Sequence, residues 1–178
     1  MRNQSSGLAG SVLAAFAMLA ALTPAAAQQN GLPGGASSLQ ETYQDWSLAC
    51  QGGESVVCAV SQQQTQQNGQ RVLAIELRRS KGGALMGNLA LPFGLLLDAG
   101  ATLQIDDGAA FEPLRFETCL PSGCLVPLAF DTAAIARLRA GTALKVKVKG
   151  TDQKELALTV SLKGLAAALD RLKVLAGG

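Results

Sequence analysis

Short segments in which apolar and polar residues alternate recur along the chain from about residue 43 onwards. Trp46 and Leu48 alternate with small residues up to Cys50, and a second clean alternation runs over residues 101–105. A period of two is typical of strands that bury one face. Further strands are expected at residues 56–61, 72–77, 84–91, 114–119, 124–130, 144–149 and 156–162. The pattern therefore predicts about nine short strands separated by turns, which is typical of an all-β sandwich or barrel.

Two segments have the helical period instead. Asp131 is a suitable N-cap for a helix over residues 133–140, and Gly141 would end it. Near the C-terminus, Leu165, Leu169 and Leu172 fall on one face of a second helix. We expect this amphipathic helix to cover an end or a face of the sheet.

The N-terminal segment has the features of an export signal. Arg2 supplies the positive charge, residues 8–22 are largely apolar, and Ala25 and Ala27 form a small-residue cleavage site. The alternative is a membrane anchor, but the apolar run falls short of the roughly 20 residues that span a bilayer. The sequence thus predicts a signal peptide at residues 1–27, a flexible Gly- and Pro-containing leader at 28–42, and one domain at 43–175 without a transmembrane segment. The predicted location is the periplasm, with the outer membrane or the medium as further destinations.

The chain contains four cysteines, and an even number in an exported protein indicates disulfides. Three pairings are possible. We predict the local one, Cys50 with Cys58 and Cys119 with Cys124, because each bond would join adjacent strands or close a tight turn. A zinc site made of the four cysteines is disfavoured by their spacing and by the oxidising compartment.

Composition excludes several kinds of chemistry. The chain has no histidine, which removes His-based triads and His metal sites, and its net charge of only +2 argues against a nucleic-acid binder. Lys145, Lys147 and Lys149 alternate with apolar residues and no aromatics. We expect these lysines on an exposed sheet edge, with an anion site as the alternative. Neither an enzyme, a cofactor nor a metal is expected. Asp106-Asp107-Gly108 is interpreted as a hairpin turn, with acid–base chemistry or calcium binding as the alternative.

Three stretches are candidate contact surfaces. The most apolar segment, residues 89–97, is interpreted as a buried crossover loop, or alternatively as an exposed patch for a partner or a membrane, with Phe93 and Leu95 as candidate contact residues. Leu120, Pro121 and Ser122 would be displayed by the turn between Cys119 and Cys124. The polar stretch 62–70 is expected to be a solvated hairpin tip, with a recognition loop as the alternative.

An ordered set of residues resembles the invasion-associated locus B family of exported bacterial proteins. The set is Trp46-x-x-x-Cys50, Cys58, Leu91-Pro92-Phe93-Gly94 with Gly100, Leu103-x-Ile105-Asp106, Phe116-x-x-Cys119-x-x-x-Gly123-Cys124, and Ser161-Leu162-x-Gly164-Leu165. It covers about residues 43–172. The resemblance implies an immunoglobulin-like β-sandwich of about nine strands with two short helices, at a periplasmic or cell-surface location, and an association with host-cell invasion in pathogens. It implies no catalytic residues. The chain departs from the family pattern after the second cysteine pair, at residues 125–127, and at Gly164-Leu165, where an aromatic is common.

The leading hypothesis is therefore an exported, non-enzymatic envelope protein that binds an envelope or host-surface partner. The alternative is a periplasmic thiol–disulfide protein that uses Cys119 and Cys124. Redox enzymes typically carry Cys-x-x-Cys before a helix, whereas this pair has a longer spacing and strand-like flanks.

Overall fold

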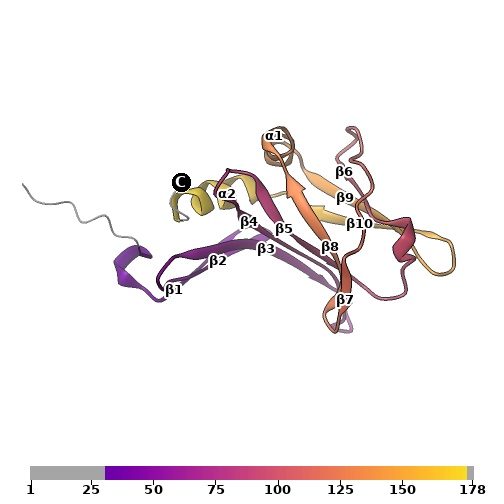
Figure 1. Ribbon diagram of the computed structural model, residues 1–178, viewed down its shortest axis with the longest axis horizontal. Helices are drawn as coiled ribbons and strands as arrows, with labels where there is room; N and C mark the ends of the chain where they lie inside the picture. Colours follow the sequence, from indigo (N-terminus) through magenta and orange to yellow (C-terminus); the bar gives the residue numbers. More distant parts are fainter. Residues whose placement is uncertain (1–30, 176–178) are drawn as a thin grey trace, which may run out of the picture.

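The computed structural model describes residues 31–175, which contain ten strands, two α-helices and two short 3-10 turns (Figure 1). The helices are α1 (Thr132–Ala140) and α2 (Leu165–Leu175), and the 3-10 turns are η1 (Pro33–Gly35) and η2 (Leu97–Ala99). The predicted all-β class with two short helices is confirmed. The expected signal peptide, residues 1–27, lies outside the described residues.

Seven strands form one antiparallel sheet. In spatial order they are β1 (Ser38–Tyr43), β2 (Trp46–Gln51), β3 (Val57–Thr65), β4 (Arg71–Arg79), β5 (Leu85–Leu91), β8 (Gly123–Phe130) and β7 (Thr118–Leu120). The first five strands are consecutive in the chain. The β7–β8 hairpin then adds to β5, which makes β7 an edge strand. The strand expected at 114–119 is shorter than predicted, since Leu114 forms only a single bridge with Ala101.

The second antiparallel sheet has three strands, in the order β10 (Glu155–Ser161), β9 (Ala143–Lys149) and β6 (Thr102–Ile105). The lysine-bearing strand β9 therefore lies in the middle of this sheet, and the prediction that its lysines protect an edge is wrong. Lys145 instead forms an ion pair with Asp107, at 2.7 Å between Nζ and Oδ1. The alternation of apolar residues along β9 reflects one buried face, and central and edge strands both have such a face.

One hydrophobic core joins the two sheets and the helices. Trp46 and Leu48 from the large sheet are 1% and 0% exposed, and Leu144 and Val146 from the small sheet are fully buried. These inward residues follow the alternation seen in the sequence. α2 packs against β1, β2, β3 and α1 and buries Leu165, Ala168, Leu169 and Leu172. Burial of apolar area at about 25 cal/mol per Å² is the main stabilising contribution of such a core.

The leader expected at residues 28–42 is partly folded. Leu32 is 2% exposed, and residues 38–43 form β1, which pairs with β2 from Ser38 opposite Gln51 to Tyr43 opposite Trp46. The prediction failed because the preceding Gly, Pro and Ser residues obscured a strand that has one polar face. The domain thus begins before the predicted residue 43.

The polar stretch 62–70 also differs from the prediction, because β3 continues to Thr65. Gln62 is 8% exposed, and its side chain both donates to Ser161 O (2.9 Å) and accepts from Ser161 N (3.2 Å). The Trp46 indole donates to the same carbonyl at 2.9 Å. These bonds pair the outer edge of β10 with side chains of the large sheet. Only residues 66–70 form the solvated turn.

Candidate functional site at the tip of the large sheet

Both predicted disulfides are confirmed. Cys50 and Cys58 face each other across β2 and β3, and Cys119 and Cys124 face each other across β7 and β8. The first pair is buried in the core. In the second pair Cys124 is 3% exposed, while Cys119 lies on the exposed edge strand. The second disulfide therefore closes a short hairpin at the surface.

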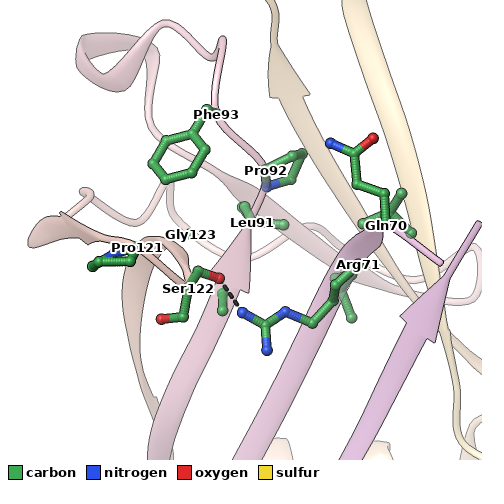
Figure 2. A pocket seen from close by; sticks show the side chains of 11 residues that line it. Gln70, Arg71, Leu91, Pro92, Phe93, Pro121, Ser122 and Gly123 are labelled. Carbon is green, nitrogen blue, oxygen red and sulfur yellow. Dashed lines mark hydrogen bonds between the residues drawn. The ribbon is translucent and has the colours of Figure 1, made fainter.

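The turn of this hairpin lies against the end of β5. Gly123 has a φ of 126°, and a Cβ at this position would lie 2.5 Å from the carbonyl oxygen of Leu91. Glycine is thus required for the close approach of the two backbones. Since Leu91 leads directly into Pro92 and Phe93, the approach brings Pro121 and Ser122 beside these residues (Figure 2).

Phe93 is the most exposed part of the apolar segment 89–97. β5 ends at the buried Leu91, Pro92 lacks the N–H that would continue the pairing, and Gly94 reverses the chain with a φ of 84°. As a result the Phe93 side chain is 62% exposed. The segment is therefore neither wholly buried nor wholly exposed, in contrast to both interpretations of its sequence.

Leu95, the other candidate of this segment, is 9% exposed and bridges Gly150. It belongs to the core rather than to a contact surface. Leu120 is 46% exposed, and Pro121 and Ser122 are also exposed. We refer to Phe93, Leu120, Pro121 and Ser122 as the tip surface.

A pocket of about 200 Å³ lies beside the tip surface. Its wall includes Pro92, Phe93, Pro121 and Ser122, together with Gln70 and Arg71 from the start of β4 (Figure 2). The Arg71 guanidinium donates through Nη2 to the carbonyl oxygen of Ser122. Three segments that are distant in the sequence thus meet here. Arg71 was missed by the sequence analysis because its partner is 51 residues away and no local pattern marks it.

Among residues 31–175, Arg71 is the only charged residue in the lining of this pocket. A guanidinium binds planar anions such as carboxylates through paired hydrogen bonds, and an exposed aromatic ring offers an apolar contact. The pocket therefore offers a ligand both a positive charge and an apolar surface. Within residues 31–175 there is no group of three or more acidic or Cys side chains placed to hold a metal ion.

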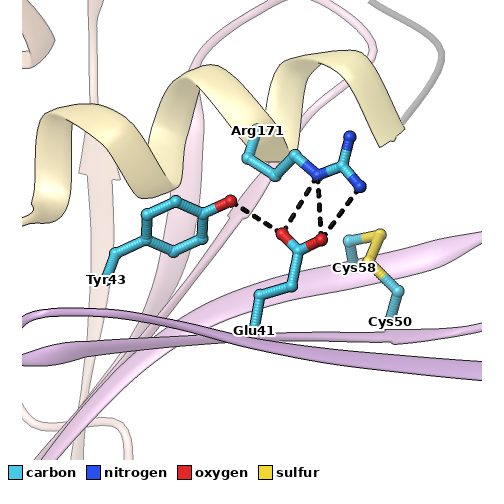
Figure 3. The surroundings of a disulfide bond; sticks show 5 residues. All are labelled: Glu41, Tyr43, Cys50, Cys58 and Arg171. Carbon is cyan, nitrogen blue, oxygen red and sulfur yellow. Dashed lines mark hydrogen bonds and ion pairs between the residues drawn. A yellow bond between two sulfur atoms is a disulfide. The ribbon is translucent and has the colours of Figure 1, made fainter.

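Two other polar clusters stabilise the fold. Glu41 on β1 accepts from Arg171 Nη2 at 2.9 Å and from the Tyr43 hydroxyl at 2.7 Å (Figure 3). The hydrogen bond from Arg171 lowers the pKa of Glu41, and the bond to Glu41 raises the pKa of Tyr43. The contact between Arg171 and Glu41 thus connects α2 to β1, close to the Cys50–Cys58 disulfide (Figure 3).

The second cluster surrounds Asp106, in the turn predicted at residues 106–108. Its carboxylate accepts from Thr142 Oγ1 at 2.6 Å and from Ala143 N at 2.9 Å. The hydrogen bond from the Thr142 side chain is the main reason why the pKa of Asp106 is lowered. The carboxylate thus joins the β6 turn to the start of β9.

None of the helices in the described part of the chain is both long and apolar enough to cross a membrane.

Comparison with known proteins agrees with the residue pattern and the fold. The family model described as "Invasion associated locus B (IalB) protein" matches residues 46–173. Invasion protein B homologues of Brucella abortus, strain 2308 and biovar 1 strain 9-941, are each 47% identical over 163 residues, which cover 90% of this chain and 92% of the relative. Invasion protein B of Bartonella bacilliformis is 36% identical over 146 residues, 79% of this chain and 78% of the relative.

A solved structure extends the likeness to three dimensions. The crystal structure of invasion associated protein B from Bartonella henselae matches with a TM-score of 0.73 and 37% identity, covering 77% of this chain and 96% of that chain. The ordered cysteine, glycine and aromatic positions, the two-sheet fold and these matches lead to one conclusion. The chain belongs to the invasion-associated locus B family.

Proposed function

We propose that this chain is an exported, non-enzymatic envelope protein that assists host-cell invasion by binding a partner through its tip surface. Membership of the family and relatives named invasion protein B support the association with invasion. The predicted signal peptide supports export to the periplasm or the cell surface. The binding role is supported by the geometry of the tip surface.

The observation that carries the proposal is the exposure of two large apolar side chains, Leu120 on a disulfide-closed hairpin and Phe93 at the end of the adjacent strand. Phe93 is 62% and Leu120 46% exposed, and both are held beside a turn that the Cys119–Cys124 disulfide closes. Aromatic residues are enriched in protein interfaces, and exposed apolar patches mark contact sites. A closed turn also loses less conformational entropy when a partner binds.

A deletion strain of the source bacterium tests this proposal. The strain would be complemented with the wild-type protein, with the double variant Phe93→Ser and Leu120→Ser, or with the control double variant Val57→Ser and Met86→Ser. Val57 and Met86 are 48% and 47% exposed and lie on the same sheet but outside the pocket. Uptake by host cells and envelope integrity would be measured in parallel, with protein amounts matched.

The tip variant is expected to fail in uptake as the deletion strain does, whereas the control variant restores it. Full uptake with the tip variant would contradict the proposed role of the tip surface. A deletion strain with reduced envelope integrity but normal uptake would assign the protein to envelope maintenance instead.

Export has its own test. Mass spectrometry of the protein from a periplasmic fraction should find a mature chain that begins at Gln28, because cleavage is predicted after Ala27. A protein in the same fraction that retains residues 1–27 would contradict the predicted cleavage.

One observation favours the thiol–disulfide alternative, namely that Cys119 lies on an exposed strand. However, the pair joins two strands, and redox cysteines commonly gain reactivity from a helix N-terminus. Catalysed reduction of insulin by the purified protein would support this alternative. The alternative would be rejected if the wild-type protein reduces insulin no faster than an equal amount of the double variant Cys119→Ser, Cys124→Ser.

A further inference from the structure

We propose that the pocket beside the tip surface binds a carboxylated sugar of a glycan, with the carboxylate on Arg71 and the sugar ring against Phe93. The inference rests on the proposed function, because it names the ligand class for the same surface.

The charge of the pocket is the first argument. Arg71 is the only charged residue in its lining, and within the described residues its hydrogen-bond partner is the neutral carbonyl of Ser122. No carboxylate among these residues forms a salt bridge with it. A guanidinium has five N–H donors, so donors remain for a ligand. One uncompensated positive charge in a fork geometry matches one carboxylate.

The position of the guanidinium is the second argument. Its bond to Ser122 holds it in the wall of the pocket, between the start of β4 and the β7–β8 turn (Figure 2). That turn is itself closed by a disulfide and fixed against Leu91 through Gly123. A charge held in this way needs little reordering when a ligand binds.

The remaining wall explains why a sugar fits. The Phe93 ring and two prolines offer apolar faces, while the Gln70 amide offers hydrogen-bonding groups. A sugar ring has an apolar C–H face and a rim of hydroxyls, which match these two kinds of surface. The volume of about 200 Å³ is below the ~300–1,000 Å³ typical of drug-sized ligands. It therefore suits a single ring at the end or along the side of a glycan.

The test compares two ligands that differ in one group. The exported protein, with both disulfides intact, would be titrated with methyl glucuronide and with methyl glucoside, whose C6 carries a hydroxyl instead of the carboxylate. Binding would be followed by NMR shifts of backbone amides and of the Arg71 Nε–H. We expect the glucuronide to bind at least tenfold more tightly, with shifts concentrated at residues 70–71, 91–93 and 121–123.

Four variants, one of them a control, assign the contacts. Arg71→Gln should weaken glucuronide binding at least tenfold, and Phe93→Ala severalfold, because each removes one of the two contacts. Arg115→Gln removes an exposed guanidinium outside this pocket and should change nothing. Arg71→Lys keeps the charge without the fork and should bind with intermediate affinity. If Arg71→Gln fails to fold, the Phe93→Ala variant still tests the proposal, because Phe93 is exposed and its replacement should not disturb the fold.

Several results would overturn the proposal. Equal affinity for both sugars, or glucuronide binding that survives Arg71→Gln in a folded protein, would remove the carboxylate contact. Binding of an acetylated peptide with a free C-terminus, but not of its amide or of the glucuronide, would assign the pocket to peptides. Uptake that depends on Phe93 and Leu120 without any glucuronide binding would refute this inference and leave the proposed function intact. Glucuronide binding without an uptake defect in the deletion strain would refute the proposed role in invasion and leave the ligand class of the pocket intact.

Discussion

At the scale of single residues, polar side chains have structural roles that their local sequence does not reveal. Asp106 stands in an Asp-Asp-Gly turn, a pattern that also suggests acid–base or cation chemistry. Its carboxylate instead receives donors from Thr142 and Ala143, some 36 residues away. Arg71 is similar, since its contact with Ser122 makes it part of the candidate site. Such pairs depend on the complete fold and could not be predicted from spacing.

The lowered pKa of Asp106 predicts an acid-sensitive contribution to stability. Because the folded state lowers this pKa, the unfolded state binds more protons, and the contribution is present above the unfolded value of 3.8. It is lost as the pH falls through the lower folded value. In urea titrations from about pH 5 to about pH 2, the stability difference between wild type and Asp106→Asn should shrink towards zero. A difference that stays constant across this range would contradict the assignment.

Gln62 gives a second prediction at this scale. Gln62→Ala would leave the backbone groups of Ser161 without the side-chain amide that pairs with them, although Trp46 still donates to the carbonyl. Loss of a hydrogen-bonding partner costs about 1–3 kcal/mol for buried polar groups, and these groups are partly buried, so we expect a loss of about 1 kcal/mol. Urea denaturation should show this loss, whereas Gln63→Ala, at an exposed neighbouring position, should remain within about 0.5 kcal/mol of wild type.

Among the strands and helices, the hydrophobic pattern predicted which residues form strands better than it predicted the order of the strands in each sheet. Trp46–Gln51 is a strand as expected, and Asp131 caps α1 by accepting from Ala134 N at 2.7 Å. The position of β9 was wrong because alternation reports one buried face and carries no information on its neighbours. β1 was missed because its outward residues are polar and its inward Glu41 finds its partner, Arg171, on a helix 130 residues later.

The packing of α2 can be tested with two positions on the same helix. Leu172 is 1% exposed, whereas Val174 is 69% exposed. Leu172→Ala should lower the free energy of unfolding by about 2–5 kcal/mol, because it removes buried methyl groups and leaves a cavity. Val174→Ala should change it by less than about 0.5 kcal/mol. Equal effects in thermal or urea unfolding would show that α2 does not pack on the sheets.

At the scale of the whole molecule, the two disulfides have different surroundings and so different expected effects. Replacing Cys119 and Cys124 by serine opens a short hairpin at the surface, and the chain-entropy estimate for so short a loop is about 2 kcal/mol. Replacing Cys50 and Cys58 by alanine also removes contacts from the core, in which these residues are 0% and 5% exposed. The second loss should be the larger. Equal losses in urea unfolding would contradict this ranking.

The fold class, both disulfides and most strands could be predicted from the sequence because alternation, turn residues and cysteine spacing are local signals. The exposure of the candidate contact residues was predicted in part, whereas their binding role stays a prediction. Phe93, Leu120, Pro121 and Ser122 are exposed as a contact surface requires, whereas Leu95 is buried. The pocket that joins two of the candidate segments to Arg71 could not be predicted, because it forms only where β4, β5 and the β7–β8 turn meet.

We propose that this family member acts through the tip surface and not through exposed apolar residues in general. The most direct measurement is the ratio of host-cell uptake between the strain with the tip variant, Phe93→Ser and Leu120→Ser, and the strain with the control variant, Val57→Ser and Met86→Ser. With equal amounts of folded protein, we expect uptake at the level of the deletion strain for the tip variant and at the level of the wild type for the control variant. Equal uptake in the two strains would contradict this proposal.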